Sequence, residues 1–221
     1  MRCLICHVDT IPEVTWSTFW KPPVQKKTCH ECEEQMDKIT APFCLGCNRP
    51  GHKGVCHDCE KWEKTNSGLL ERNVAAFPYN EFNKDIVARW KYRGDYAVLD
   101  AYKEHLQKVW LASGYEGKLA LSVPLSNKRL HERGFNQSEA IIHVLEEEVT
   151  SLFERSHSEK QSKRGRKDRM QSENPFRLLQ PVKDPVVIVD DIYTTGRTVR
   201  HMASLLKEQG CPSVSSFTIF R

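Results

Sequence analysis

The chain has 221 residues, 28% of them charged, and a formal net charge of +4 at pH 7, which is enough length for one full-sized domain and a smaller one. Its longest apolar runs, such as VVIV, are far shorter than the roughly 18 residues of a membrane span, and the opening MRCLICHVDT lacks the apolar region of a secretory signal. We therefore expect a cytoplasmic protein, and the small net charge only weakly indicates a nucleic-acid partner.

Cysteine is concentrated at the start of the chain. Eight of the nine cysteines form four C-x-x-C pairs before residue 60, which are Cys3 with Cys6, Cys29 with Cys32, Cys44 with Cys47, and Cys56 with Cys59. One such pair can bind a metal ion, and two pairs complete a tetrahedral Cys₄ zinc site. Disulfides are disfavoured in the cytoplasm, and redox C-x-x-C motifs seldom come four in a row. The pattern therefore predicts two structural zinc ions.

Two pairings of these motifs are open. A sequential arrangement joins the first two motifs at one ion and the last two at the other, whereas a cross-brace interleaves them. The short, turn-rich NRPGHKGV between Cys47 and Cys56 favours the sequential form. Four histidines lie nearby, but four thiolates already satisfy each zinc, so we expect these side chains outside the ligand sets. They are His7, His30, His52 and His57.

Residues 1–68 are expected to form a zinc-binding unit that is too small to fold on apolar burial alone. We expect its aromatic side chains to fill a small core, with a stacking platform for single-stranded nucleic acid as the alternative. These side chains are Trp16, Phe19, Trp20 and Trp62. The polar EKTNSGLLER then indicates a linker, and residues 69–221 form the second predicted domain.

From about residue 73 strand and helix patterns alternate, which is typical of a mostly parallel α/β sheet flanked by helices. The expected strands are NVAAFPY, KLALSVPL, TSLF, VVIV and SVSSFTIF. The expected helices are two within 82–111, broken around Gly94, one over 136–147 and one over 198–209. SNKRLHERG, which follows the second strand, is expected to be a charged loop.

The longest polar run lies between the third and fourth strands and has almost no aliphatic residue, so we expect an exposed loop. Between residues 160 and 171 it carries six basic residues against the single acid Asp168, namely Lys160, Lys163, Arg164, Arg166, Lys167 and Arg169. Such a cluster attracts phosphates, although a solvated charged loop is the common alternative.

VVIVDDIYTTGRT, residues 186–198, places Asp190 and Asp191 at the carboxyl end of a buried strand, where α/β folds bind ligands. The following turn contains Gly196 and three threonines and precedes a helix, so its N–H groups and the helix dipole favour a phosphate. Carboxylates would repel that phosphate, but they suit sugar hydroxyls or a divalent cation. The combination predicts a site for a ribose 5-phosphate.

These thirteen residues resemble the phosphoribosyl-pyrophosphate (PRPP) signature of type I phosphoribosyltransferases. The resemblance implies that Asp190 and Asp191 are catalytic residues that bind the ribose hydroxyls with the help of magnesium. It also implies that the loop cradles the 5-phosphate through Thr194, Thr195, Gly196, Arg197 and Thr198. The 6-oxopurine transferases carry a carboxylate at the position of Thr194, so this chain departs from them, which argues against purine salvage.

VPLSNKRLHERGFNQSEAI, together with the cysteine-rich start, resembles the ComFC branch of the ComF family of competence proteins, and so do the residues from Gln161 to Phe176. The resemblance implies pyrophosphate contacts from Lys128, Arg129 and Arg133, and a flexible loop over PRPP that contributes Lys163, Arg164 and Arg166. Capping and packing explain equally well the residues at the start of the helix expected over 136–147. These residues are Arg133, Phe135, Asn136 and Gln137.

Three functions follow from these patterns. The ComF resemblance implies a cytoplasmic protein that acts with a helicase-like ATPase of the ComFA type as single-stranded DNA enters the cell, and we take this as the main hypothesis, with a retained PRPP site. An active phosphoribosyltransferase on an unidentified acceptor is the second, in which electrostatic stabilisation of the departing pyrophosphate drives pentosyl transfer. A regulator that senses PRPP without turnover is the third.

Overall fold

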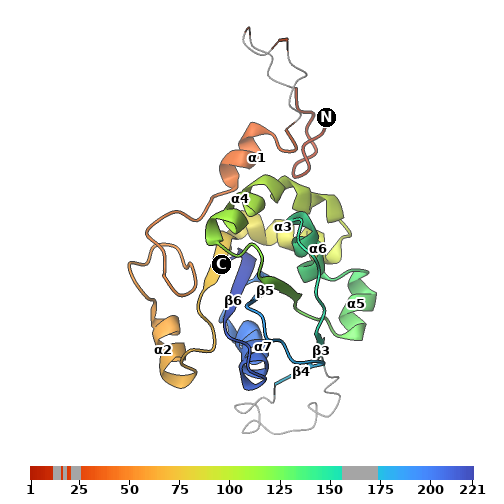
Figure 1. The fold of residues 1–221 in the computed structure, drawn as a ribbon. Coiled ribbons are helices and arrows are strands. Elements are labelled where there is room, and N and C mark those ends of the chain that lie inside the picture. The colour runs from red at the N-terminus through yellow and green to blue at the C-terminus, as the bar shows by residue number, and fades with distance from the viewer. Residues whose placement is uncertain (12–15, 17–18, 21–25, 156–173) are drawn as a thin grey trace, which may run out of the picture.

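A computed structural model of the chain describes residues 1–11, 16, 19–20, 26–155 and 174–221 (Figure 1). Its centre is a four-stranded parallel sheet in the order β1-β6-β5-β2. The strands are β1 (Asn73–Phe77), β2 (Leu119–Ser122), β5 (Val186–Ile192) and β6 (Val214–Phe220). β5 and β6 are the inner strands, and their apolar residues are buried except for the half-buried Ile192, as expected for a parallel sheet that is covered on both faces.

Helices cover the two faces of this sheet. One face packs against α3 (Glu81–Tyr92), the 3₁₀ helix η1 (Tyr96–Ala101), α4 (Lys103–Ser113) and α6 (Gln137–Val144), which share a core with Val187 and Val189. The opposite face packs against α7 (Arg197–Glu208), which shares a second core with Val186 and Ile188. The predicted α/β class, a parallel sheet flanked by helices, is therefore confirmed.

Two local predictions were wrong. SNKRLHERG is not a loop but contains α5 (Asn127–Arg133), where the Ser126 hydroxyl accepts a hydrogen bond from the Arg129 N–H (3.4 Å) and Gly134 ends the helix in a left-handed conformation. TSLF is also mostly outside a strand, since β3 covers Phe153–Arg155 and pairs antiparallel with β4 (Phe176–Leu178). Thr150 instead makes an isolated parallel bridge to Leu121.

The two cysteine units lie on opposite faces of the sheet. Cys3 and Cys32 belong to the core of the α3 and α4 face, together with the start of the chain and α1 (His30–Gln35). The second unit contains α2 (His57–Thr65), and Cys44, Cys47, Cys56 and Cys59 all belong to the α7 core. Figure 1 shows this separation, with α1 above α4 and α2 beside α7. Each unit is therefore continuous with the apolar core of one face.

The aromatic residues of the first unit do not fill a core as predicted. Trp16, Phe19 and Trp20 are 91%, 47% and 82% exposed, and Phe19 stacks on Trp20 with 4.0 Å between ring centroids. Ile5 and Met36, rather than these aromatic residues, are the side chains by which this unit joins the core of the α3 and α4 face. Trp62 is half-buried.

None of the described helices has the length and apolarity that crossing a membrane requires.

Candidate functional site

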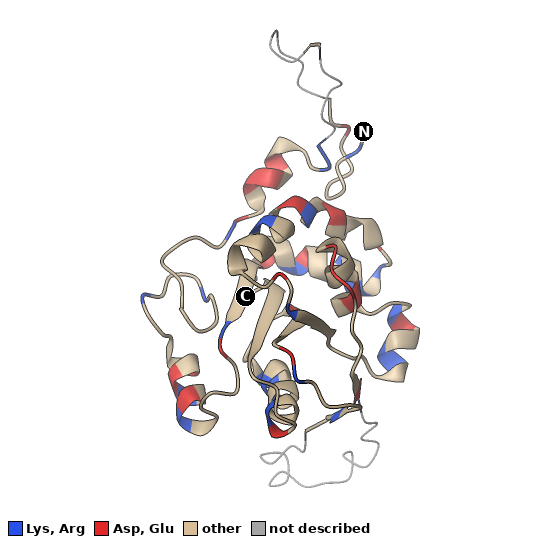
Figure 2. Cartoon of the chain, viewed as in Figure 1, with Lys and Arg blue, Asp and Glu red and all other residues tan. Residues whose placement is uncertain are grey.

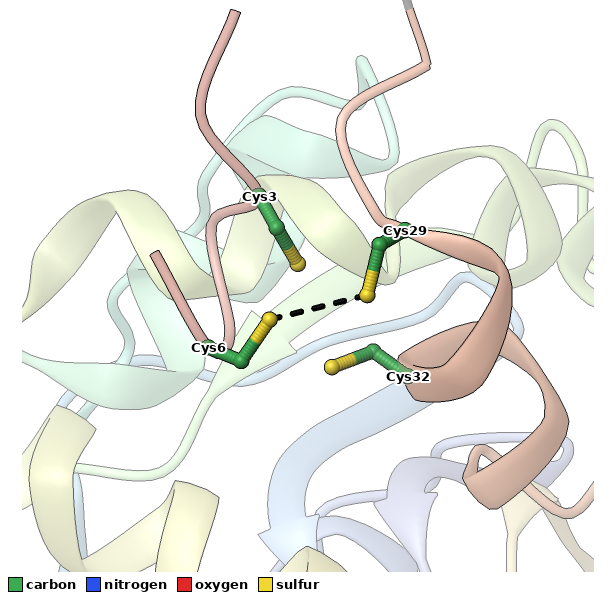
Figure 3. Close-up of side chains that lie close together, drawn as sticks. All are labelled: Cys3, Cys6, Cys29 and Cys32. Atoms are coloured by element: carbon green, nitrogen blue, oxygen red, sulfur yellow. Dashed lines mark hydrogen bonds between the residues drawn. The ribbon is translucent and has the colours of Figure 1, made fainter. Parts of the chain in front are cut away.

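The eight paired cysteines form two four-sulfur clusters in the sequential arrangement. One contains Cys3, Cys6, Cys29 and Cys32, and the other contains Cys44, Cys47, Cys56 and Cys59, with the four sulfur atoms of each within 4.8 Å of one another. Figure 3 shows the first cluster with its side chains converging. Among the described residues, both clusters consist of cysteine alone.

The sulfur spacing fits a tetrahedral metal. The Sγ atoms of Cys6 and Cys29 are 3.5 Å apart, and those of Cys47 and Cys56 are 3.6 Å apart. Four thiolates at the usual zinc–sulfur distance of about 2.3 Å place the sulfur atoms about 3.8 Å from each other. A thiolate also needs stabilisation. Burial raises the pKa of Cys44, but backbone N–H groups, chiefly that of Cys56, outweigh it and lower this pKa to about 7.

Each cluster is assembled from a tight turn and the start of a helix. The first C-x-x-C of each unit is followed by a residue in the left-handed conformation, His7 (φ 61°) or Asn48 (φ 57°). The second C-x-x-C spans the first turn of α1 or α2. Gly46 allows the turn in the second unit, because a Cβ there would lie 3.0 Å from the Cys59 sulfur. The two units are thus a structural repeat in which each helix is tied to its own cluster.

The acidic pair lies at the carboxyl end of β5. Asp191 is 9% exposed and forms an ion pair with Lys91 of α3, and both side chains of this pair are 12% exposed. Asp190 is half-buried beside it and accepts a hydrogen bond from the Asp191 N–H (2.9 Å). Burial and the adjacent Asp191 carboxylate raise the pKa of Asp190 to about 7, although Lys91 and Arg155 oppose the shift.

We call residues 194–198 the phosphate loop. It follows β5 directly, and α7 begins at Arg197, so the positive end of a twelve-residue helix faces this loop. Gly196 has φ 75°, and a Cβ at this position would overlap the side chains of Tyr193 and Arg200. The Arg200 guanidinium also donates to the Gly196 carbonyl (3.3 Å). The loop conformation therefore requires glycine here.

The carbonyl groups of the loop are bound by side chains from distant parts of the chain. Trp62 of α2 donates its Nε1–H to the Thr195 carbonyl (2.8 Å). Arg221, which follows β6, donates from Nη1 to the carbonyls of Tyr193 (3.2 Å) and Thr194 (3.1 Å). The hydroxyl-bearing side chains of Thr194 and Thr195 remain exposed. The loop is thus bound on one side and open on the other.

Basic residues approach the acidic pair from α5 and β3. Arg129 is exposed on α5, and Arg155 is half-buried on β3. Burial and the nearby charge of Arg129 lower the pKa of Arg155, while the charge of Asp190 opposes this shift. Lys128 is also exposed and pairs with Glu132 at 3.9 Å. Figure 2 shows this basic side of α5, and it shows α1 as an acidic helix.

Arg133 is held by its neighbours. Its Nη1 donates to the Gln137 side chain (2.6 Å), and its guanidinium stacks on Tyr92 with 5.3 Å to the ring centroid. Asn136 caps α6 by accepting from the Ser138 N–H (2.9 Å). These contacts support the capping and packing interpretation of this stretch. The basic run with Lys160, Lys163, Arg164, Arg166, Lys167 and Arg169 lies outside the described residues.

Sequence reasoning missed four residues of this site, which are Lys91, Arg155, Trp62 and Arg221. All four reach it from elements far along the chain, so no local motif marks them. The KYRGD that contains Lys91 offered a signal, because a lysine at the end of an amphipathic helix and before a glycine turn can reach the neighbouring sheet edge.

Residues 132–221 match the family model described as the phosphoribosyl transferase domain. The chain is 34% identical over 227 residues to the competence protein ComFC of Bacillus subtilis strain 168, covering 99% of this chain and 94% of that protein. It is 30% identical to the competence protein ComFC of Streptococcus pneumoniae R6, covering both chains completely.

More distant likenesses involve parts of the chain. The DNA utilization protein YhgH of Shigella flexneri is 37% identical over 111 residues, which is 46% of this chain and 48% of that protein. A hypoxanthine phosphoribosyltransferase structure from Staphylococcus aureus matches with a TM-score of 0.29 and 17% identity over 52% of this chain and 62% of that one. At this TM-score the structural likeness adds no weight to the assignment.

Proposed function

The chain belongs to the ComFC family of competence proteins, and we propose that it serves the uptake of single-stranded transforming DNA in the cytoplasm through a domain that binds PRPP. The observation that carries the PRPP part is the pairing of a diol-binding and an anion-binding group at one sheet edge. Asp190 and Asp191 lie in the last three residues of β5, the phosphate loop begins two residues after the strand, at Thr194, and α7 begins at Arg197. A ribose 5-phosphate presents those same two groups to a protein.

The acidic pair is suited to hold a ribose. Ionised carboxylates accept hydrogen bonds from both hydroxyls of a vicinal diol, and Lys91 reduces the charge repulsion between the two acids. Magnesium prefers carboxylate and phosphate oxygens, so the carboxyl end of β5 is compatible with a magnesium ion bound to the pyrophosphate of PRPP. Such an ion would neutralise part of the negative charge of the pyrophosphate.

The basic side chains on α5 and β3 are suited to the pyrophosphate. Arg155 lies within electrostatic range of both Arg129 and Asp190, and two arginines close together favour an anion between them. Arg133 is engaged with Gln137 and Tyr92, so its contribution is to position α5 and α6. We assign the pyrophosphate contact to Arg129, with Arg155 and the exposed Lys128 as additional contacts.

The two cysteine clusters are proposed to hold zinc. Each offers four thiolates with a tetrahedral spacing, which leaves no position open for a substrate. Their role is therefore structural, and the metals contribute folding free energy to two units whose described residues form only one short helix each.

We further propose that the protein contacts single-stranded DNA and a ComFA-type ATPase during uptake. α1 is acidic, carrying Glu31, Glu33 and Glu34, so we do not expect single-stranded DNA to bind there. The basic residues between 160 and 169 are the stronger contact, because neutralising phosphates with Lys and Arg releases counterions. The exposed aromatic residues Trp16, Phe19 and Trp20 offer rings for base stacking.

The DNA contact is tested with a variant that changes Lys163, Arg164, Arg166 and Lys167 to Gln. Single-strand affinity should fall and its dependence on salt should flatten. Lys61→Gln/Lys64→Gln on the exposed face of α2 is the control and should leave the salt slope unchanged. An unchanged slope in the first variant would exclude this loop as the contact.

The biological role is tested by changing Asp190 and Asp191 together to Ala in a naturally transformable host. We expect loss of transformation with a normal level of folded, metal-loaded protein. Full transformation by this variant would show that the site is not needed for uptake.

A further inference from the structure

The phosphate loop is held from its carbonyl side by three donors. Four consecutive carbonyls are bound in this way, those of Tyr193 and Thr194 by Arg221, that of Thr195 by Trp62 and that of Gly196 by Arg200. In a trans peptide the carbonyl and the following N–H point in opposite directions. The N–H groups that follow these carbonyls, beginning with that of Thr194, are therefore directed away from the donors and toward the side where an anion would bind.

Trp62 is fixed by the second cysteine cluster. It lies three residues, about one helical turn, after Cys59 on α2, and the cluster holds the first turn of that helix. Its indole ring also packs against the Arg200 guanidinium, with 4.7 Å from Cζ to the ring centroid. Because Arg200 binds the Gly196 carbonyl, one ring supports two neighbouring carbonyl contacts.

Arg221 is fixed by the same cluster and by the sheet. Its Nη2 donates to the Cys47 sulfur (3.2 Å), while its Nη1 reaches the loop. Its backbone N–H donates to the Phe77 carbonyl (2.9 Å), and its carbonyl accepts from the Tyr79 N–H (2.9 Å). A metal ion held by the cluster would fix the position of the Cys47 sulfur, which is the acceptor of this contact, and would thereby orient the guanidinium.

We propose that Trp62 and Arg221 are positioning residues of the phosphate loop, and that metal binding by the second cysteine cluster sets their positions. Binding of a sugar phosphate, which rests on the function proposed above, then depends on the metal held by Cys44, Cys47, Cys56 and Cys59. The first cluster has no such role, because its residues pack on the opposite face of the sheet. The cysteine unit is thus part of the binding site's scaffold and more than a separate module.

The test follows the loop without any ligand. Amide hydrogen exchange is measured at Tyr193 and Arg200, which flank the loop and donate to the carbonyls of Phe220 (2.9 Å) and Gly196 (3.2 Å). The variants are metal-loaded Trp62→Phe, which keeps the ring but loses the donor, and Arg221→Gln. Each should speed exchange at these two amides about tenfold, because the loop between them opens more often when its carbonyl contacts are removed. Exchange in β6 and α4 should stay at the wild-type rate, which separates a local effect from general destabilisation.

Three matched variants control this comparison. Trp16→Phe changes an exposed tryptophan, and Arg177→Gln removes an exposed arginine that pairs with Glu154. Both should leave exchange at Tyr193 and Arg200 unchanged. Arg221→Lys keeps a cationic donor and should recover part of the protection. If Trp62→Phe and Arg221→Gln both exchange at the wild-type rate at these two amides, the inference is wrong.

The metal is tested with Cys44→Ser, which leaves the Cys47 sulfur in place for Arg221, and with Cys6→Ser, and the zinc content of both is measured first. Loss of the second zinc should speed exchange at Tyr193 and Arg200, whereas loss of the first should not. Equal effects of the two would overturn the claim of a specific link. PRPP affinity is then measured on the same proteins with magnesium present, and Trp62→Phe should bind about tenfold more weakly. If wild type does not bind PRPP, the proposed function fails, while the exchange result still decides the positioning role.

Discussion

Replacing Lys91 with Met tests whether the Lys91–Asp191 ion pair stabilises the folded protein. The two side chains are each only 12% exposed, so this ion pair is nearly buried. Removing one partner of a buried pair costs about 3–5 kcal/mol, because the remaining charge loses its compensation. Asp190 lies beside it and adds repulsion, whereas the open sheet edge admits some water. We expect a loss of about 3 kcal/mol, equivalent to a fall in Tm of about 6–12 °C for a chain of this size.

The assay is urea unfolding of the metal-loaded protein at pH 7.5, with the m-value as a check that the folded state stays compact. Lys91→Met/Asp191→Asn should recover a large part of the loss, with a coupling energy of about 2 kcal/mol between the two sites. Lys84→Met removes an exposed pair with Glu81 (3.3 Å) and should stay within about 0.5 kcal/mol of wild type. A Lys91→Met protein as stable as wild type would refute the account of a buried ion pair. So would a double variant whose loss of unfolding free energy equals the sum of the losses in Lys91→Met and Asp191→Asn.

Three further predictions concern the loop, the acids and the metals. The pKa of Asp190 is raised to about 7 in the folded protein, so the folded state loses stability as pH rises from about 4 through 7. Asp190→Asn should therefore stabilise the protein by roughly 2–4 kcal/mol at pH 8.5 and by less at pH 5.5. Equal shifts of the urea midpoint at the two pH values would contradict this prediction. Gly114 has a similar φ to Gly196, but a Cβ added there would meet open space, so Gly114→Ala should cost about 1 kcal/mol of unfolding free energy. Gly196→Ala should cost more, because its added Cβ would overlap neighbouring side chains. Equal falls in Tm for the two variants would count against the packed loop. Native mass spectrometry should find two zinc ions in the wild type and one in Cys6→Ser, and any other stoichiometry would reject the paired Cys₄ scheme.

The sequence predicted the parts of this protein that depend on local pattern. The apolar run before Asp190 predicts a buried strand, and spacing within C-x-x-C pairs predicts the clusters, because both are properties of neighbouring residues. α5 was missed since none of its residues is buried, and so it has no apolar periodicity. Its only signals were the cap residues Ser126 and Gly134, which a reading based on periodicity overlooks.

The contacts that organise the site could not be predicted in this way. Trp62 and Thr195 are separated by 133 residues, and Arg221 and Cys47 by 174. Such pairs are decided by how the cysteine unit docks on the α7 face, and this depends on the shape of the whole core. The same reasoning explains the wrong prediction for Trp16 and Trp20, because burial in a small unit depends on which surface it packs against.

The central claim is that the edge of β5 and the phosphate loop bind a ribose 5-phosphate. The most direct measurement is calorimetric titration of the zinc-loaded protein with PRPP and magnesium, beside the Asp190→Ala/Asp191→Ala variant. We predict saturable binding to wild type that disappears in the variant. Absence of binding to wild type at millimolar PRPP, or equal binding to both proteins, would contradict the claim.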